Sequence, residues 1–142
     1  MVLFDTIYLN YIHFINTASQ PNGQIKMVAQ TLANLITPWA GTGLDRIFYA
    51  GSYAKQTWVR GSSDLDLFIS LKSDVLENLE GIHDSLWVLM RNLKIPSKKQ
   101  NVSIGVDYGG LKIDLTPGKK QSSQTNDHSI YSHRKNTWTK TN

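Results

Sequence analysis

The sequence predicts an α/β fold, in which a small mixed β-sheet is backed by helices on one side. Stretches with an apolar residue at every second position are typical of strands, and they alternate along the chain with stretches that have the three-and-four spacing of amphipathic helices. Apolar residues make up 40% of the 142 residues and charged residues 18%. This composition indicates a folded core and excludes intrinsic disorder as a description of the whole chain.

Two helices are predicted in the first third of the chain. Residues 3–16 carry a wide apolar stripe of Leu, Ile, Phe and Tyr at helical spacing. A second helix has start signals at Ser19 and Pro21, and we expect it to end near Thr37 because Pro38 follows. Both helices are interpreted as packing elements, although the aromatic stripe of the first would also suit a partner surface.

Strands and a third helix follow. Residues 46–50 and 65–71 are short apolar stretches that predict strands. Residues 73–93 return to helical spacing, with Gly81 as a candidate break. These segments place one helix between pairs of strands, which supports the α/β class.

A β-hairpin is the clearest local prediction. Apolar residues alternate through residues 102–108 and again through residues 111–115, and Gly109 and Gly110 supply a two-residue turn between them. We expect the return strand to end at Pro117, because proline and the glycine after it are typical of turns.

The length favours a single domain over residues 1–142. We divide it into N-terminal helices (1–44), a core (45–117) and a polar C-terminal segment (118–142), with a short strand predicted near residues 129–132. The last residues carry no recognisable cap or turn, so we expect a truncated chain or a segment that needs further chain or a partner.

Charge and cysteine content narrow the function. Residues 1–90 carry 5 basic and 8 acidic side chains, whereas residues 91–142 carry 10 basic and 3 acidic ones. A basic C-terminal part would attract a nucleoside triphosphate or a nucleic acid, although a solvated lysine-rich surface explains it equally well. The absence of cysteine excludes a disulfide framework and a cysteine nucleophile. Neither a signal peptide nor a bilayer-spanning run is present, so we expect a cytoplasmic protein without a membrane partner.

Three carboxylates form the candidate site. Asp64 and Asp66 stand two residues apart in a predicted strand, so their side chains project from one face. Asp114 has the opposite parity to its apolar neighbours in the hairpin. We expect the three to converge and hold Mg²⁺, which prefers oxygen ligands, and two such ions suit an in-line phosphoryl displacement. An isolated Asp-x-Asp pair is more often only the solvent face of a strand, so its context decides.

That context includes a candidate phosphate site. Gly51 and Ser52 follow a predicted strand and precede a predicted helical turn, where backbone N–H groups and the Ser52 hydroxyl would receive a phosphate. Lys55 and Arg60 lie between this turn and the carboxylates, and would offset triphosphate charge. A Gly-Ser pair is also among the commonest turns.

The stretch GSYAKQTWVRGSSDLDLFISL, followed by VDYGGLKIDLTPG, resembles the active-site signature of the polymerase-β type nucleotidyltransferases. That signature is a Gly-Ser, a short spacer, an Asp-hydrophobic-Asp strand and a third acidic residue on a later strand. Within the superfamily, the chain is most similar to the 2′-5′ oligoadenylate synthetases, the bacterial cyclic oligonucleotide synthetases and the archaeal CCA-adding enzymes. The likeness covers residues 45–117 and, more loosely, the segment from residue 127.

The resemblance implies a role for each motif residue. The residues that would contact the donor triphosphate are Gly51, Ser52, Lys55 and Arg60. Asp64 and Asp66 would ligate Mg²⁺, with Mn²⁺ as a substitute. Asp114 would ligate the catalytic metal and help to deprotonate the acceptor hydroxyl.

The implied reaction transfers a nucleoside monophosphate from a triphosphate to a hydroxyl of a nucleotide or RNA and releases pyrophosphate. The product would be a cyclic or linear oligonucleotide, or an extended nucleic acid. Relatives continue into a helical domain that helps bind the nucleobase and the acceptor, and we expect the catalytic domain over residues 1–142 to lack it.

Two other functions remain open from the sequence. One is a minimal nucleotidyltransferase that AMPylates a protein partner, as paired antitoxins of this superfamily do. The other is a non-catalytic nucleotide- or RNA-binding module in which the carboxylates hold a structural cation. Outside the motif, polar loop residues and tryptophans are weaker candidates for phosphate contact or base stacking, and we interpret them as solvated loop or packing residues: His128, His133, Arg134, Lys135, Trp58, Trp87 and Trp138.

Overall fold

The computed structural model describes residues 23–51, 65–125, 127–132 and 137–141. The predicted helix over residues 3–16 lies outside this part of the chain. The described residues form the following elements: α2 (Gly23–Ala40), η1 (Gly41–Gly43), β1 (Leu44–Ala50), β2 (Leu65–Leu71), α4 (Leu79–Asn92), β3 (Ser97–Lys99), β4 (Ile104–Tyr108), β5 (Leu111–Lys120), β6 (His128–Ser132) and β7 (Thr137–Thr141).

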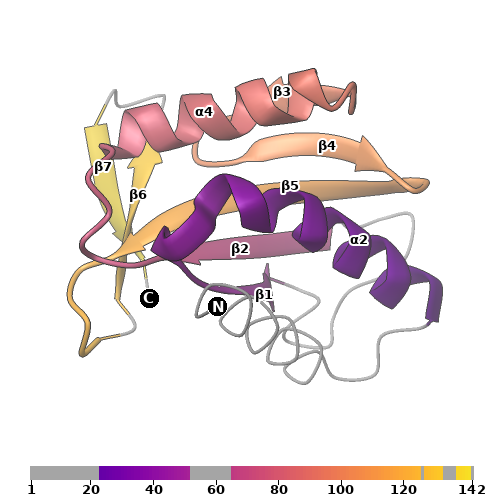
Figure 1. The fold of residues 1–142 in the computed structure, drawn as a ribbon. Helices are drawn as coiled ribbons and strands as arrows, with labels where there is room; N and C mark the ends of the chain where they lie inside the picture. The colour runs from indigo at the N-terminus through magenta and orange to yellow at the C-terminus, as the bar shows by residue number, and fades with distance from the viewer. Residues whose placement is uncertain (1–22, 52–64, 126, 133–136, 142) are drawn as a thin grey trace.

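The seven described strands form one mixed sheet (Figure 1). Its main path runs in the order β1-β2-β5-β4-β3, and β6 and β7 extend it from the far end of β5. Strands β2 and β5 are parallel, whereas the other neighbouring pairs are antiparallel. The ten-residue strand β5 therefore connects both parts of the sheet, because it pairs with β2, β4 and β6.

The two described helices pack on the same face of this sheet. Figure 1 shows α2 crossing that face, with α4 running along it near β3 and β4. The odd-numbered residues of β2 and the first half of β5 point toward the helices and are buried with them in one core. This core includes Ile25, Leu32 and Ile36 of α2, Ile82, Leu86 and Met90 of α4, Leu67, Ile69, Ile113 and Leu115 of these two strands, and Ile104 and Val106 of β4. The predicted class, a mixed sheet with helices on one side, is confirmed.

Helix α2 continues past the residue where we expected it to end. Pro38 lies inside the helix, which ends at Ala40 and not near Thr37. Proline removes one helical hydrogen bond, but the last turn is tied to α4 because the Trp39 indole N–H donates to Ser85 Oγ at 2.8 Å. This tertiary contact explains why the local signal was misleading.

Helix α4 begins six residues later than predicted. It starts at Leu79, and Gly81 lies in its first turn instead of breaking it. The Asn78 side chain caps the helix by accepting a hydrogen bond from the Gly81 backbone N–H at 2.7 Å. The apolar residues before this cap had suggested a longer helix, yet Leu76 is fully exposed.

The turn of the hairpin is confirmed, but β4 starts at Ile104 instead of residue 102, and β5 ends later than predicted. Gly109 and Gly110 take φ values of 60° and 79°, which a two-residue turn of this kind requires. Strand β5 does not stop at Pro117 but runs on to Lys120. Its pairing with β4 ends at Leu115 and its pairing with β6 starts at Lys119, so the proline falls where only β2 pairs with this strand. None of the described helices is both long and apolar enough to cross a membrane.

Candidate functional site

Asp66 and Asp114 lie side by side on the sheet face opposite the helices. They are Cα partners in the parallel ladder between β2 and β5, where neighbouring strands are about 4.8 Å apart. Their flanking residues Leu65, Leu67 and Leu115 are buried in the core, while both carboxylates are partly exposed. Alternation along each strand therefore presents two acidic side chains together on the face that neither described helix covers, here named the open face, as the sequence predicted.

Gly51 lies against the Asp66 carboxylate. It follows β1, whose last residue, Ala50, is the Cα partner of Asp66. A Cβ atom added to Gly51 would stand 2.0 Å from Asp66 Oδ2, and the residue has a φ of +61°. Both facts favour glycine, since other residues rarely adopt this conformation and a side chain would have to displace the carboxylate. The fold thus brings the start of the predicted phosphate turn to the first of the two carboxylates.

The other predicted site residues are Ser52, Lys55, Arg60 and Asp64, and they lie outside the described residues. Among the residues that are described, no three His, Asp or Glu side chains group closely enough to hold a metal ion. The described site therefore contributes the pair Asp66 and Asp114. Two hard carboxylate ligands on one open face fit Mg²⁺, which is typically held by one or two carboxylates together with substrate phosphates.

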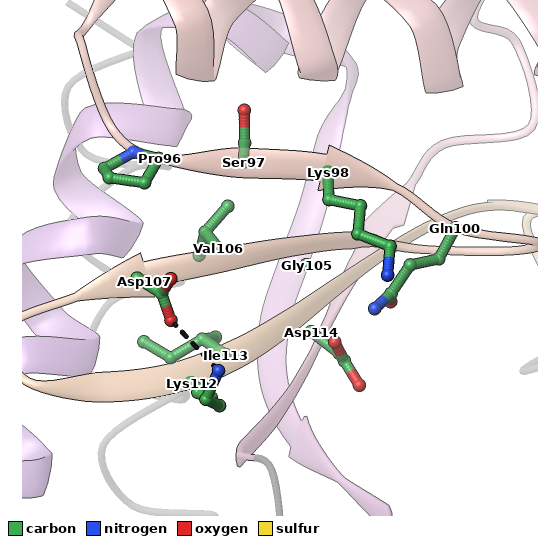
Figure 2. Close-up of a pocket in the computed structure, with 10 residues that line it drawn as sticks. All are labelled: Pro96, Ser97, Lys98, Gln100, Gly105, Val106, Asp107, Lys112, Ile113 and Asp114. Atoms are coloured by element: carbon green, nitrogen blue, oxygen red, sulfur yellow. Dashed lines mark ion pairs between the residues drawn. The ribbon is translucent and has the colours of Figure 1, made fainter.

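A pocket of about 310 Å³ opens beside Asp114 and is lined by residues of β3, β4 and β5 (Figure 2). Gly51 follows β1, which lies at the other end of this strand order. Its polar lining residues include Lys98, Gln100, Asp107, Lys112 and Asp114. Lys112 Nζ lies 3.8 Å from Asp107 Oδ1, whereas the side chains of Lys98 and Gln100 extend toward Asp114 (Figure 2). Sequence reasoning missed these two residues. The polar run SKKQ carries no apolar alternation, so β3 was not predicted and its neighbour across the sheet was unknown.

We expected His128 to be a solvated loop residue, and this prediction is wrong. It is the first residue of β6 and only 2% exposed. Its Nε2 lies 2.7 Å from Ser70 Oγ, and its ring meets Phe68 edge-on with ring centroids 4.8 Å apart. This histidine fastens β6 to β2 and does not contact the carboxylate pair, because Ser70 stands four residues along the strand from Asp66, roughly 13 Å away.

The remaining candidates contribute nothing to the described site. Trp87 lies on α4, where Arg91 and Lys99 stack on its ring with 4.8 and 5.0 Å to the centroid. Its packing role is the one that we expected. The side chains of His133, Arg134, Lys135, Trp58 and Trp138 lie outside the described part of the chain.

Comparison with known protein families gives one match over more than half of the chain. The model described as "Nucleotidyltransferase domain" matches residues 37–126. This range contains β1, β2, β4 and β5, and with them Gly51, Asp66 and Asp114. A search of curated protein sequences finds no significant match.

Three solved structures illustrate the similarity in fold. The first is CdnC of E. coli MS115-1, solved with ATP, with a TM-score of 0.58 and 22% sequence identity. The aligned region covers 94% of this chain and 42% of the CdnC chain. The second is the CD-NTase CdnG of Bradyrhizobium diazoefficiens in complex with GTP, with a TM-score of 0.56 and 16% identity. The alignment covers 99% of this chain and 39% of CdnG. The third is the cyclic dinucleotide synthase CdnE of Elizabethkingia meningoseptica with GTP and Apcpp, with a TM-score of 0.55 and 17% identity. The alignment covers 93% of this chain and 48% of CdnE. The chain thus spans less than half the length of each of these proteins.

Proposed function

Because this chain belongs to the nucleotidyltransferase domain family, we propose that it transfers a nucleoside monophosphate from a triphosphate to a hydroxyl acceptor and releases pyrophosphate. The observation that carries the proposal is the pairing of Asp66 with Asp114 on the open face of the sheet, beside Gly51. Glycine lets the backbone after β1 lie against the first carboxylate, and the donor phosphates would bind at this turn. The acceptor hydroxyl would lie at Asp114.

Asp66 and Asp114 would hold the Mg²⁺ ions, together with Asp64. When bound, such ions neutralise charge on the triphosphate and on the oxygens of the reacting phosphorus, which is the main catalytic need in phosphoryl transfer. The chain's own residues orient the reactants: Gly51 and Ser52 would bind the donor phosphates, and Asp114 would accept the proton of the attacking hydroxyl. Lys55 and Arg60 would offset phosphate charge.

We further propose that the product is a cyclic or linear oligonucleotide. The similar fold of a cyclic dinucleotide synthase, and of two relatives solved with ATP or GTP, supports this product class. Magnesium dependence and a cytoplasmic site of action belong to the same proposal.

The test is to incubate the protein with Mg²⁺ and all four labelled nucleoside triphosphates, with and without RNA. Pyrophosphate release and the products, separated by mass spectrometry, are measured for the wild type and for Asp66→Asn and Asp114→Asn. Each substitution keeps the size of the side chain but removes its charge, so we expect release to fall on the order of a hundredfold or more.

Asp127→Asn is the matched control. Asp127 is exposed and lies before β6, away from the pair, so its replacement should leave release unchanged. If Asp66→Asn and Asp114→Asn release pyrophosphate as fast as the wild type, the assignment is wrong. A nucleotide found covalently attached to a protein, without any free oligonucleotide, would instead identify the protein-modifying branch.

A further inference from the structure

Five residues form one row across the open face of the sheet. Ala50 pairs with Asp66, Asp66 with Asp114, Asp114 with Gly105, and Gly105 with Lys98. The row therefore begins next to Gly51, crosses both carboxylates and ends at a cation two strands beyond Asp114. Since adjacent strands are about 4.8 Å apart, Lys98 begins roughly 9.6 Å from Asp114.

Gly105 makes the gap between Asp114 and Lys98 accessible to side chains. A Cβ atom at Gly105 would stand 2.8 Å from Gln100 Nε2 and 3.1 Å from Gln100 Cδ. The carboxamide of Gln100 thus occupies the space that a side chain at position 105 would fill. In this position, Gln100 Nε2 lies against β4, the strand that pairs with the Asp114 strand β5.

A hydrogen bond from Ser103 sets the orientation of the Gln100 carboxamide. Ser103 Oγ donates a hydrogen bond to Gln100 Oε1 at 2.6 Å, and the Gln100 backbone N–H donates to Ser103 O at 2.9 Å. The amide oxygen is thereby used, and the amide N–H groups remain as donors. Within the described part of the chain, neither these N–H groups nor the Lys98 ammonium has a hydrogen-bond or ion-pair partner.

We propose that Lys98 and Gln100 determine the acceptor class by binding the phosphate of an acceptor nucleotide whose hydroxyl faces Asp114. An ammonium and oriented N–H donors suit phosphate oxygens, and the pocket of about 310 Å³ has the size of small-ligand sites. A nucleotide carries a hydroxyl and a phosphate on the same ribose, and so bridges Asp114 and the two donors. This inference rests on the proposed function, which places the acceptor hydroxyl at Asp114.

The experiment measures binding of AMP and of adenosine, after a non-hydrolysable ATP analogue and Mg²⁺ have filled the donor site. The wild type should bind AMP more tightly than adenosine. Gln100→Glu retains the oxygen that accepts from Ser103 but replaces the donor with a negative charge, and Lys98→Gln removes the cation. We expect each to weaken AMP binding about tenfold and to leave adenosine binding unchanged.

Gly105→Ala provides a second variant, because its methyl group displaces the Gln100 amide and should weaken AMP binding in the same direction. Lys72→Gln is the control, since this exposed lysine lies at the end of β2, outside the pocket. Equal affinity for AMP and adenosine in the wild type, or unchanged AMP affinity in both Gln100→Glu and Lys98→Gln, would overturn the inference. A protein hydroxyl acceptor predicts that outcome.

These results are separable from the test of the proposed function. Loss of pyrophosphate release in Asp66→Asn, together with unchanged AMP binding in both Gln100→Glu and Lys98→Gln, overturns this inference alone. If the wild type releases no pyrophosphate while AMP binding behaves as expected, the proposed transfer is wrong, but the phosphate contact stands.

Discussion

Gly51 combines an unusual backbone conformation with a close contact to a site carboxylate. Its positive φ and its contact with Asp66 are independent, and each disfavours a side chain at this position. Sequence alone suggested a phosphate turn here, because a glycine follows a strand. It could not show that the glycine also accommodates a carboxylate, since that contact depends on the pairing of β1 with β2.

Replacing Gly51 with alanine should reduce pyrophosphate release by roughly tenfold or more, because the new methyl group must push the Asp66 carboxylate from its position. The left-handed backbone adds a folding cost of about 1–2 kcal/mol. Steady-state pyrophosphate release measures the first effect and urea denaturation the second.

Gly110→Ala separates strain from displacement. Gly110 has a φ of +79°, but an added Cβ would meet nothing within 4 Å. We expect a similar loss of stability and little change in release. Equal losses of release in the two variants would show that the contact with Asp66 is unimportant.

The other site residues also divide into those that the sequence could predict and those that depend on strand pairing. Asp66 and Asp114 were predictable because a two-residue period fixes the face of a strand side chain. Lys98 and Gln100 were not, because their proximity to Asp114 depends on Gly105 lying between them in the register.

At the scale of elements, strands with an apolar alternation were predicted and polar ones were not. Strand β2 has the predicted bounds, Leu65–Leu71, and the turn of the β4–β5 hairpin was predicted from its two glycines. Strands β3 and β7 have the sequences SKK and TWTKT. With so few apolar residues, they are strands because a neighbour offers hydrogen bonds, and this information is not local in the sequence.

Strand β6 is attached to β2 through buried polar groups. Ser70 Oγ donates to Asp45 Oδ2 at 3.1 Å and lies 2.7 Å from His128 Nε2. Ser70→Ala deprives a buried imidazole of this partner, so we expect unfolding to become easier by about 1–3 kcal/mol. Urea denaturation gives the free energy, and amide hydrogen exchange in β6 should accelerate.

Ser129→Ala is the control for that substitution. Ser129 neighbours His128 on β6 but is only partly buried, so its loss should change the free energy of unfolding by no more than about 0.5 kcal/mol. The proposed attachment is wrong if the two serine variants have the same stability.

At the scale of the whole molecule, the carboxylates lie on the sheet face opposite the core that packs against the two described helices. Odd positions of β2 and β5 build this core with α2 and α4, whereas the even positions 66 and 114 carry the carboxylates and position 70 contributes the contact to β6. Leu67 and Leu115, which are Cα partners in the ladder, directly follow Asp66 and Asp114. The spacing of the two carboxylates is therefore maintained by the apolar layer behind them.

Leu115→Ala tests this dependence. Leu115 is completely buried, and removing a buried leucine side chain typically costs about 2–5 kcal/mol, depending on how far the cavity collapses. That is a large fraction of the 5–15 kcal/mol or so that stabilises an ordinary domain. Leu76→Ala removes the same atoms from a fully exposed position and should change the free energy of unfolding by about 0.5 kcal/mol at most. A Leu115→Ala variant as stable as Leu76→Ala in urea would mean that the face behind the carboxylates is not the core.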